Sequence, residues 1–205
     1  MRAFCGDADG ILEVVSVDAD TAEIVIWNPD GSQAEMSGNG TRIAARWLAD
    51  LTSLDRVQIS VGGRTVVARV QPDGQIEQEL GSAEIGSPEV VDGIELVPVS
   101  VGNPHAVVLG DPADIVRIGP LLETHRRFPE RTNVQVARVD SPGIVTARVW
   151  ERGVGETASS GTSAVAVAAA THGEGTVVVR FPGGELTVRL ADGGATLTGP
   201  AERID

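Results

Sequence analysis

Apolar residues along the chain recur in short, β-branched runs, and turn-forming residues separate these runs. This pattern is typical of strands joined by tight turns. In the first part of the chain it predicts strands over residues 10–17, 22–27, 56–61 and 65–70. The third and fourth runs flank Gly62-Gly63, which indicates a hairpin.

The pattern changes to a helical period after Ser37-Gly38-Asn39-Gly40, a segment with the composition of a tight turn. An amphipathic helix is predicted over residues 41–51, with Thr41 or Asn39 as its cap. Further along, an Ala- and Val-rich run predicts a second helix over residues 162–171. The strands predicted around that helix are 96–101, 106–109, 133–139, 145–150, 176–181 and 185–190.

The two parts of the chain repeat one plan: strands, then Ser-Gly with a small or polar residue, then a helix. We therefore predict an α+β fold with two pseudo-symmetric halves, residues 1–94 and 95–205, and a tail that can return to the first half. Segment 81–93 is the expected crossing. The two helix N-termini are predicted to face each other across a cleft and to offer N–H groups to a carboxylate. Simple capped helix starts remain the alternative.

Composition restricts the class of protein. The net charge of −13 argues against nucleic-acid binding, which needs clustered basic residues. No apolar stretch approaches the length of a membrane span, and the N-terminus lacks a signal-peptide pattern, so we expect a soluble, cytoplasmic protein without a membrane partner.

All sixteen basic residues are arginine. Without lysine, the chain cannot hold pyridoxal phosphate as a Schiff base or form a Walker-type phosphate loop. The single cysteine, Cys5, excludes an internal disulfide, and the three scattered histidines do not have metal-ligand spacing. We expect no metal and no cofactor.

Several ordered motifs carry a resemblance to one enzyme family. Trp27-Asn28-Pro29-Asp30-Gly31-Ser32 and Met36-Ser37-Gly38-Asn39-Gly40-Thr41-Arg42 resemble the first signature of diaminopimelate epimerases, except that Ser37 replaces a catalytic cysteine. Segment 150–162 resembles the second signature, with Ser160 in place of the other cysteine. Gly102-Asn103-Pro104-His105 and Arg131-Thr132-Asn133-Val134 resemble two further substrate-contacting segments, and segment 197–202 resembles the family's ending.

The resemblance implies a fold and a function. Each half is expected to be a curved, mostly antiparallel sheet around a central helix. The implied enzyme is a cofactor-independent isomerase that interconverts LL- and meso-diaminopimelate in lysine and peptidoglycan-precursor biosynthesis, and it is expected to be a homodimer. The family begins with a further strand and helix, whereas Asp7-Ala8-Asp9-Gly10 resembles a later segment. The first half is therefore expected to be incomplete relative to the family.

The resemblance also implies roles for individual residues. Ser37 and Ser160 occupy the acid–base positions, and His105 and Glu151 are expected to tune them or to act as the base. Glu151 and Arg152 are expected to hold the distal ammonium and carboxylate groups of the substrate. The α-carboxylate is expected at Gly38 with Asn39 and at Gly161 with Thr162. Hydrogen bonds to the substrate are expected from four asparagines: Asn28, Asn39, Asn103 and Asn133.

The serine pair keeps other functions open. Epimerisation needs an acid and a base on opposite faces of the α-carbon, and a serine hydroxyl is far less acidic than a cysteine thiol. A non-catalytic amino-acid-binding homologue and a one-base isomerase or dehydratase of the same fold are therefore alternatives. A serine hydrolase is disfavoured, since the sequence has no Gly-x-Ser-x-Gly elbow.

Overall fold

The computed structural model describes residue 8 and residues 10–202, and Cys5 lies outside them. The described chain divides into two compact units. The first unit contains the residues up to Leu80 together with those from Thr196 onward, and the second unit is Gly81–Ala195. This boundary lies before the predicted one at residues 94 and 95, and the division into two functional halves stays a prediction. No helix in the described chain has both the length and the apolar character that crossing a membrane requires.

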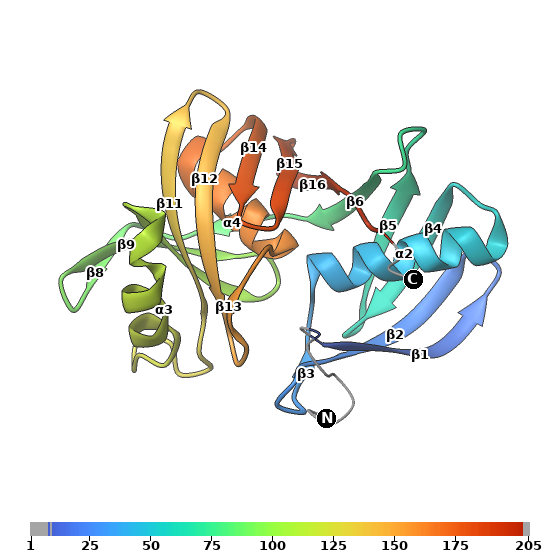
Figure 1. The fold of residues 1–205 in the computed structure, drawn as a ribbon, viewed down its shortest axis with the longest axis horizontal. Helices are drawn as coiled ribbons and strands as arrows, with labels where there is room; N and C mark the ends of the chain where they lie inside the picture. Colours follow the sequence, from blue (N-terminus) through green and yellow to red (C-terminus); the bar gives the residue numbers. More distant parts are fainter. Residues whose placement is uncertain (1–7, 9, 203–205) are drawn as a thin grey trace. The chain divides into compact units, whose positions relative to one another are not determined.

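The first unit is a curved sheet packed on one helix (Figure 1). Its elements are β1 (Ile11–Asp18), β2 (Thr21–Trp27), β3 (Gln33–Ala34), α2 (Gly38–Thr52), β4 (Arg56–Val61), β5 (Arg64–Val70), β6 (Ile76–Gly81) and β16 (Gly194–Gly199). The strand order is β1-β2-β4-β5-β6-β16, with β2 and β4 parallel. Alternate residues of β4, such as Val57 and Ile59, are buried, and α2 packs against β2, β4 and β5.

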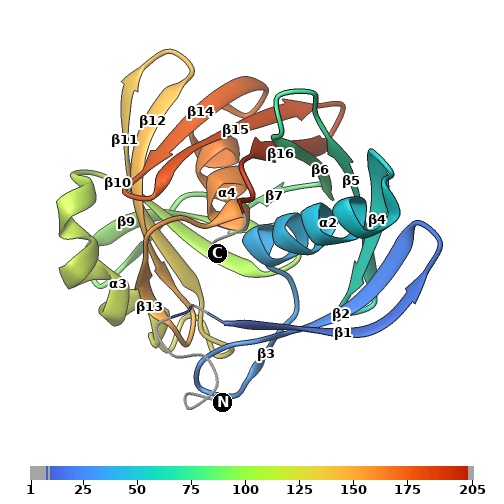
Figure 2. The ribbon, with the colours of Figure 1, turned by 45° about the vertical axis from the view of Figure 1, so that its right-hand side comes forward.

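The second unit encloses its central helix more completely (Figure 2). Its elements are β7 (Glu84–Ile85), β8 (Glu89–Val91), β9 (Ile94–Ser100), β10 (Pro104–Leu109), the 3₁₀ turn η1 (Pro112–Asp114), α3 (Ile115–Glu123), β11 (Asn133–Ser141), β12 (Ile144–Glu151), β13 (Gly155–Thr157), α4 (Gly161–His172), β14 (Gly175–Phe181) and β15 (Gly184–Ala191). The order is β15-β14-β12-β11-β10-β9-β7. Every residue of α4 from Gly161 to Ala169 is buried, as expected of a helix that is apolar on all sides.

Helix α3 covers another face of the second unit and was not predicted. Gly119 and Pro120 stand inside it, and both residue types disfavour helices. The helix forms because its apolar residues Ile115, Ile118 and Leu122 pack in one core cluster with residues of β10 and β11. Gly119 allows close approach, since a Cβ there would lie 2.7 Å from Cβ and Cγ of Trp150.

The predicted α+β class, with a curved sheet around a helix in each part, is confirmed. The predicted strands are present with ends shifted by two residues or fewer. Strands β3, β6, β13 and β16 were missed, and the expected crossing 81–93 contains β7 and β8. The predicted cap of α2 was wrong. The helix begins at Gly38, and its cap is Ser37, a favoured N-cap residue whose hydroxyl accepts the Gly40 N–H at 3.0 Å.

Candidate active site

Three predicted site segments meet at one end of the sheet in the second unit. His105 at the start of β10 is opposite Asn133 at the start of β11. Next along β11, Val134 is opposite Trp150, so Asn133 lies beside Glu151 at the end of β12. Strand register alone therefore gathers His105, Asn133 and Glu151, which are far apart in the sequence.

Glu151 connects this end of the sheet to the start of α4. Its Oε2 accepts a hydrogen bond from the Ser160 hydroxyl at 3.1 Å, and its Oε1 accepts one from Thr157 Oγ1 at 2.6 Å. Ser160 is the N-cap residue of α4, is only 4% exposed, and makes no side-chain cap bond. The serine hydroxyl therefore points its proton at a carboxylate, an arrangement that a general base requires.

His105 is buried within a chain of neutral polar groups. Its Nε2 lies 2.9 Å from Asn103 Oδ1, and its Nδ1 lies 2.9 Å from the amide nitrogen of Gln135. Burial lowers the pKa of His105 to about 3, so the imidazole is neutral at physiological pH. An Nε2–H tautomer satisfies both contacts, because Asn103 offers an acceptor and Gln135 a donor. Asn103 in turn donates from Nδ2 to Thr162 Oγ1 at 3.4 Å.

This arrangement gives His105 a clear structural effect: it orients Asn103 beside the second residue of α4. Accepting a proton would require it to become charged in a buried site, which its low pKa disfavours. The tuning role inferred from the resemblance stays a prediction.

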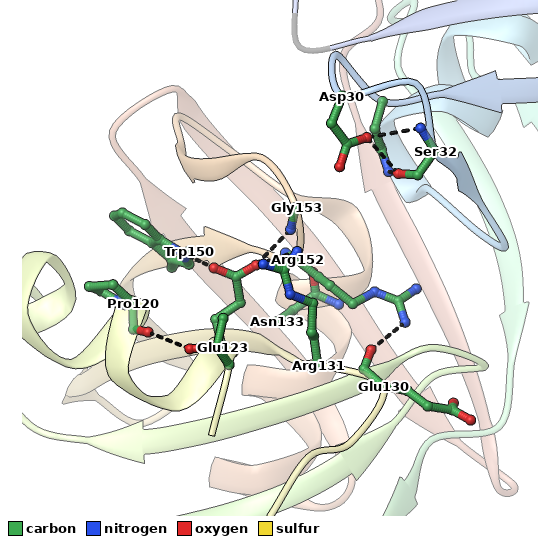
Figure 3. A network of polar contacts seen from close by, with 12 residues as sticks. Asp30, Ser32, Pro120, Glu123, Glu130, Arg131, Asn133, Trp150, Arg152 and Gly153 are labelled. Carbon is green, nitrogen blue, oxygen red and sulfur yellow. Dashed lines mark hydrogen bonds and ion pairs between the residues drawn. The ribbon is translucent and has the colours of Figure 1, made fainter. Parts of the chain in front are cut away.

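The Asn133 side chain is hydrogen-bonded to the backbone of Arg152. Asn133 Oδ1 accepts the Arg152 N–H at 3.0 Å, and its Nδ2 donates to Pro104 O at 2.9 Å. The Arg152 guanidinium donates to Glu130 O at 3.2 Å (Figure 3). Both ends of the Asn133 amide therefore hold neighbouring loops, and its predicted contact with a substrate stays a prediction.

In the first unit, the start of α2 is held by a buried arginine. Arg42 donates to Pro200 O at 2.7 Å and to Asn39 Oδ1 at 3.1 Å. Burial lowers the pKa of Arg42 to about 10, so the side chain keeps its charge at neutral pH. Gln78 from β6 reaches the same turn, where its amide lies 2.8 Å from Thr41 Oγ1. These contacts fix the backbone that carries Ser37, Gly38 and Asn39.

Asn28 lies in the turn that follows β2. Its Nδ2 donates to Ser32 Oγ at 3.0 Å, and Asp30 accepts from both the hydroxyl and the N–H of Ser32 (Figure 3). The turn is thus closed by its own side chains, which is the ordinary behaviour of asparagine and aspartate in turns. Its predicted substrate contact stays a prediction.

Both helices present the N-terminal geometry expected for a carboxylate site. Gly38 and Gly161 are the first residues of α2 and α4, followed by Asn39 and Thr162. The first N–H groups of a helix have no intrahelical acceptor, and the helix dipole favours an anion there. Because Ser37 and Ser160 belong to different units, their action on one carbon stays a prediction.

Sequence reasoning missed several polar residues that shape these sites. Gln78 and Gln135 are fully buried and have apolar buried neighbours, Ile76 and Leu80 in β6 and Val134 and Val136 in β11. A polar residue within such an apolar pattern is a usable signal. Thr157, Arg42 and Glu123 had no comparable signal, because their partners come from segments distant in the chain.

Acidic, histidine and cysteine side chains do not gather into a possible metal site anywhere in residues 10–202. The expectation that the reaction needs neither a metal nor a cofactor stays a prediction.

Solved structures share the fold. A predicted epimerase from Pseudomonas aeruginosa superposes with a TM-score of 0.75 at 17% identity, over 97% of this chain and 84% of that one. A hydroxyproline epimerase from Agrobacterium vitis superposes with a TM-score of 0.66, also at 17% identity, over 93% and 71%. At such low identity these structures show the fold alone.

Sequence relatives are more specific. The diaminopimelate epimerase of Thermobifida fusca is 40% identical over 225 residues, which cover 98% of this chain and 82% of that protein. The diaminopimelate epimerase of Thioalkalivibrio sulfidiphilus is 37% identical over 207 residues, 87% of this chain and 74% of that protein. The diaminopimelate epimerase family model matches residues 1–86 and 97–204. The chain therefore belongs to the diaminopimelate epimerase family.

Proposed function

We propose that this protein interconverts LL- and meso-diaminopimelate by moving a proton on and off an α-carbon, without a cofactor. Family membership supports the isomerase class. The observation that carries the mechanism is the 3.1 Å hydrogen bond from the Ser160 hydroxyl to Glu151 at the N-terminus of α4. This hydrogen bond places the Glu151 carboxylate where it can take the proton of Ser160, whose hydroxyl alone would be a poor base.

In the proposed reaction, the Ser160–Glu151 pair handles the proton on one face of the α-carbon. Glu151 accepts the serine proton while the serine oxygen takes the α-hydrogen, so the net transfer is from carbon to carboxylate. Thr157 donates to the other carboxylate oxygen and holds it in place. The helix N-terminus stabilises the substrate carboxylate as negative charge develops.

Ser37 is proposed for the opposite face. Its Oγ accepts the Gly40 N–H at 3.0 Å, which favours negative charge on the oxygen after it gives its proton to the carbanion. Solvent then restores the proton on Ser37 and removes the one on Glu151. Arg152 is proposed to bind the distal carboxylate, and the four asparagines of the motifs to orient the substrate.

A second candidate is a one-base isomerase or dehydratase of the same fold. The two serines differ in a way that favours it: the Ser160 hydroxyl donates to a carboxylate, whereas the Ser37 hydroxyl accepts a backbone N–H. An enzyme that only removes a proton needs the first arrangement and can dispense with the second. A non-catalytic amino-acid binder would need neither.

Exchange of the diaminopimelate α-hydrogen with deuterium, followed by NMR, separates these functions. Exchange with inversion supports the epimerase, exchange with retention supports the one-base enzyme, and binding without exchange supports the binder. Glu151→Gln should reduce exchange about 10²–10⁴-fold, since it removes the general base. Glu185→Gln makes the same change at an exposed ion pair with Arg180 and should leave exchange unaltered.

We further propose that the protein is a cytoplasmic homodimer, as the family resemblance implies. Light scattering across a range of protein concentrations tests the dimer, and a monomer at every concentration would contradict it. Cell fractionation with an antibody tests the compartment.

A further inference from the structure

Glu123, the last residue of α3, is buried, and its side chain is 10% exposed. Its Oε2 accepts the indole N–H of Trp150 at 2.8 Å, and its Oε1 accepts the backbone N–H of Gly153 at 2.8 Å (Figure 3). Arg131 Nη1 lies 3.5 Å from Oε1 and is half exposed. A buried carboxylate is tolerated only when donors satisfy it, and here two of the three donors flank residues 151 and 152.

The contacts around this carboxylate place it at the junction of three segments. The Thr132 N–H donates to the Glu123 backbone carbonyl at 3.2 Å, so the loop before β11 is tied to the same residue. Gly119, one turn earlier in α3, lies against the Trp150 ring. The helix is therefore fixed against Trp150 by packing and by a hydrogen bond at once.

We propose that Glu123 is a positioning residue that sets the turn carrying Glu151 and Arg152. This inference rests on the proposed function of that turn. The Glu123 carboxylate accepts hydrogen bonds from Trp150, the residue before Glu151, and from Gly153, the residue after Arg152. The Asn133 side chain accepts the Arg152 N–H between them. The segment that carries both side chains is thus held at residues 150, 152 and 153.

The consequence concerns binding more than chemistry, because Thr157 and Ser160 hold the Glu151 carboxylate independently of Glu123. The Arg152 guanidinium can make two parallel hydrogen bonds to a carboxylate only if the backbone that carries the side chain is fixed in position. Loosening the turn therefore weakens substrate binding in the ground state and the transition state alike, which raises KM and leaves kcat less affected. A purely structural role would instead lower the amount of folded protein without changing the KM of the folded fraction.

Glu123→Gln is the test, because it keeps the size of the side chain and replaces one acceptor oxygen with a donor that faces an N–H group. We expect the Kd and KM for diaminopimelate to rise about tenfold to a hundredfold, the effect of losing a hydrogen bond to a charged group. In ¹⁵N NMR spectra, the Trp150 indole proton should shift upfield and the Gly153 amide should exchange faster with deuterium. Glu185→Gln is the matched control and should change none of these quantities.

Trp150→Phe is a second variant that removes the indole donor together with part of the ring system, and it keeps an aromatic ring against Gly119. It should raise the Kd in the same direction by a smaller factor, and it serves if Glu123→Gln does not fold. A wild-type Kd in either variant, or an unchanged Gly153 exchange rate in Glu123→Gln, would overturn the inference. If the wild type itself binds no diaminopimelate, the proposed function fails, and Gly153 exchange alone then decides whether Glu123 holds the turn.

Discussion

Cysteines introduced at positions 37 and 160 should differ in acidity, because the two serine hydroxyls have opposite hydrogen-bonding surroundings. A thiol at position 37 would sit where the Gly40 N–H points at 3.0 Å, at the start of α2. A thiol at position 160 would face the Glu151 carboxylate at about the 3.1 Å separation of the present hydroxyl. The first environment favours a thiolate and the second favours a neutral thiol.

The magnitudes follow from these contacts. A hydrogen bond to a charged group contributes about 1.5–3 kcal/mol and a helix N-terminus about 0.3–1 kcal/mol. At about 1.4 kcal/mol per pKa unit, the thiol pKa at position 37 should fall about one to three units below the usual 8.5. Repulsion from a carboxylate about 4 Å away is worth about 4 kcal/mol at an effective dielectric constant of 20. Even after offset by the helix N-terminus, it should raise the thiol pKa at position 160 by one unit or more.

The assay is the pH dependence of alkylation by iodoacetamide in Ser37→Cys and Ser160→Cys, each in a Cys5→Ser background so that one thiol reports. The Cys5→Ser parent is the control. A pKa at position 160 equal to or below that at position 37 would refute the reasoning, since it would mean that Glu151 does not act on that side chain.

Activity provides the second half of the same test. A thiolate on one face and a thiol on the other form the acid–base pair that inversion needs, so the double variant should epimerise diaminopimelate about 10²–10⁴-fold faster than the wild type. Each single variant should gain little, because it supplies only one face. A double variant that folds and binds diaminopimelate but exchanges no α-hydrogen would favour the binder or a different substrate.

Three further outcomes are expected. Gly119→Ala should lower the free energy of unfolding by about 1–2 kcal/mol, because a Cβ 2.7 Å from Trp150 overpacks the core and this cost exceeds the gain in helix propensity. Thermal denaturation measures the change, and Gly110→Ala, where the nearest atom is 3.8 Å from the added Cβ, is the control. The folded-state pKa of His105, about 3, lies below its unfolded value of 6.5, so stability from this residue is complete above pH 6.5 and falls by about 1.4 kcal/mol per pH unit towards pH 3. Urea unfolding should show a shallower acid loss in His105→Gln, and equal slopes would contradict the assignment. Prolonged treatment with a chelator should leave α-hydrogen exchange unchanged, and a loss that a divalent metal restores would contradict a metal-free site.

Local pattern was sufficient for most of the secondary structure. Strands such as β4 and β5 alternate buried and exposed residues and are joined at Gly62-Gly63, and α4 is built of residues that favour an apolar helix, so neighbours in sequence determine both. The same local information placed a serine at the start of each helix. It assigned the cap of α2 to the wrong residue, because the N-cap depends on which backbone N–H the side chain meets.

Tertiary structure decided the rest, because partners in a buried site come from distant segments. Helix α3 contains Gly119 and Pro120, and only packing on β10, β11 and Trp150 makes it a helix. Glu123 looks like an ordinary surface glutamate in the sequence, yet it is buried because two N–H donors from β12 and the following turn meet it. The resemblance named Glu151 as a possible base, but the spacing of residues 151 and 160 did not predict its hydrogen bond with Ser160. Strand register and the entry of α4 bring those two side chains together, and neither is a property of the local sequence.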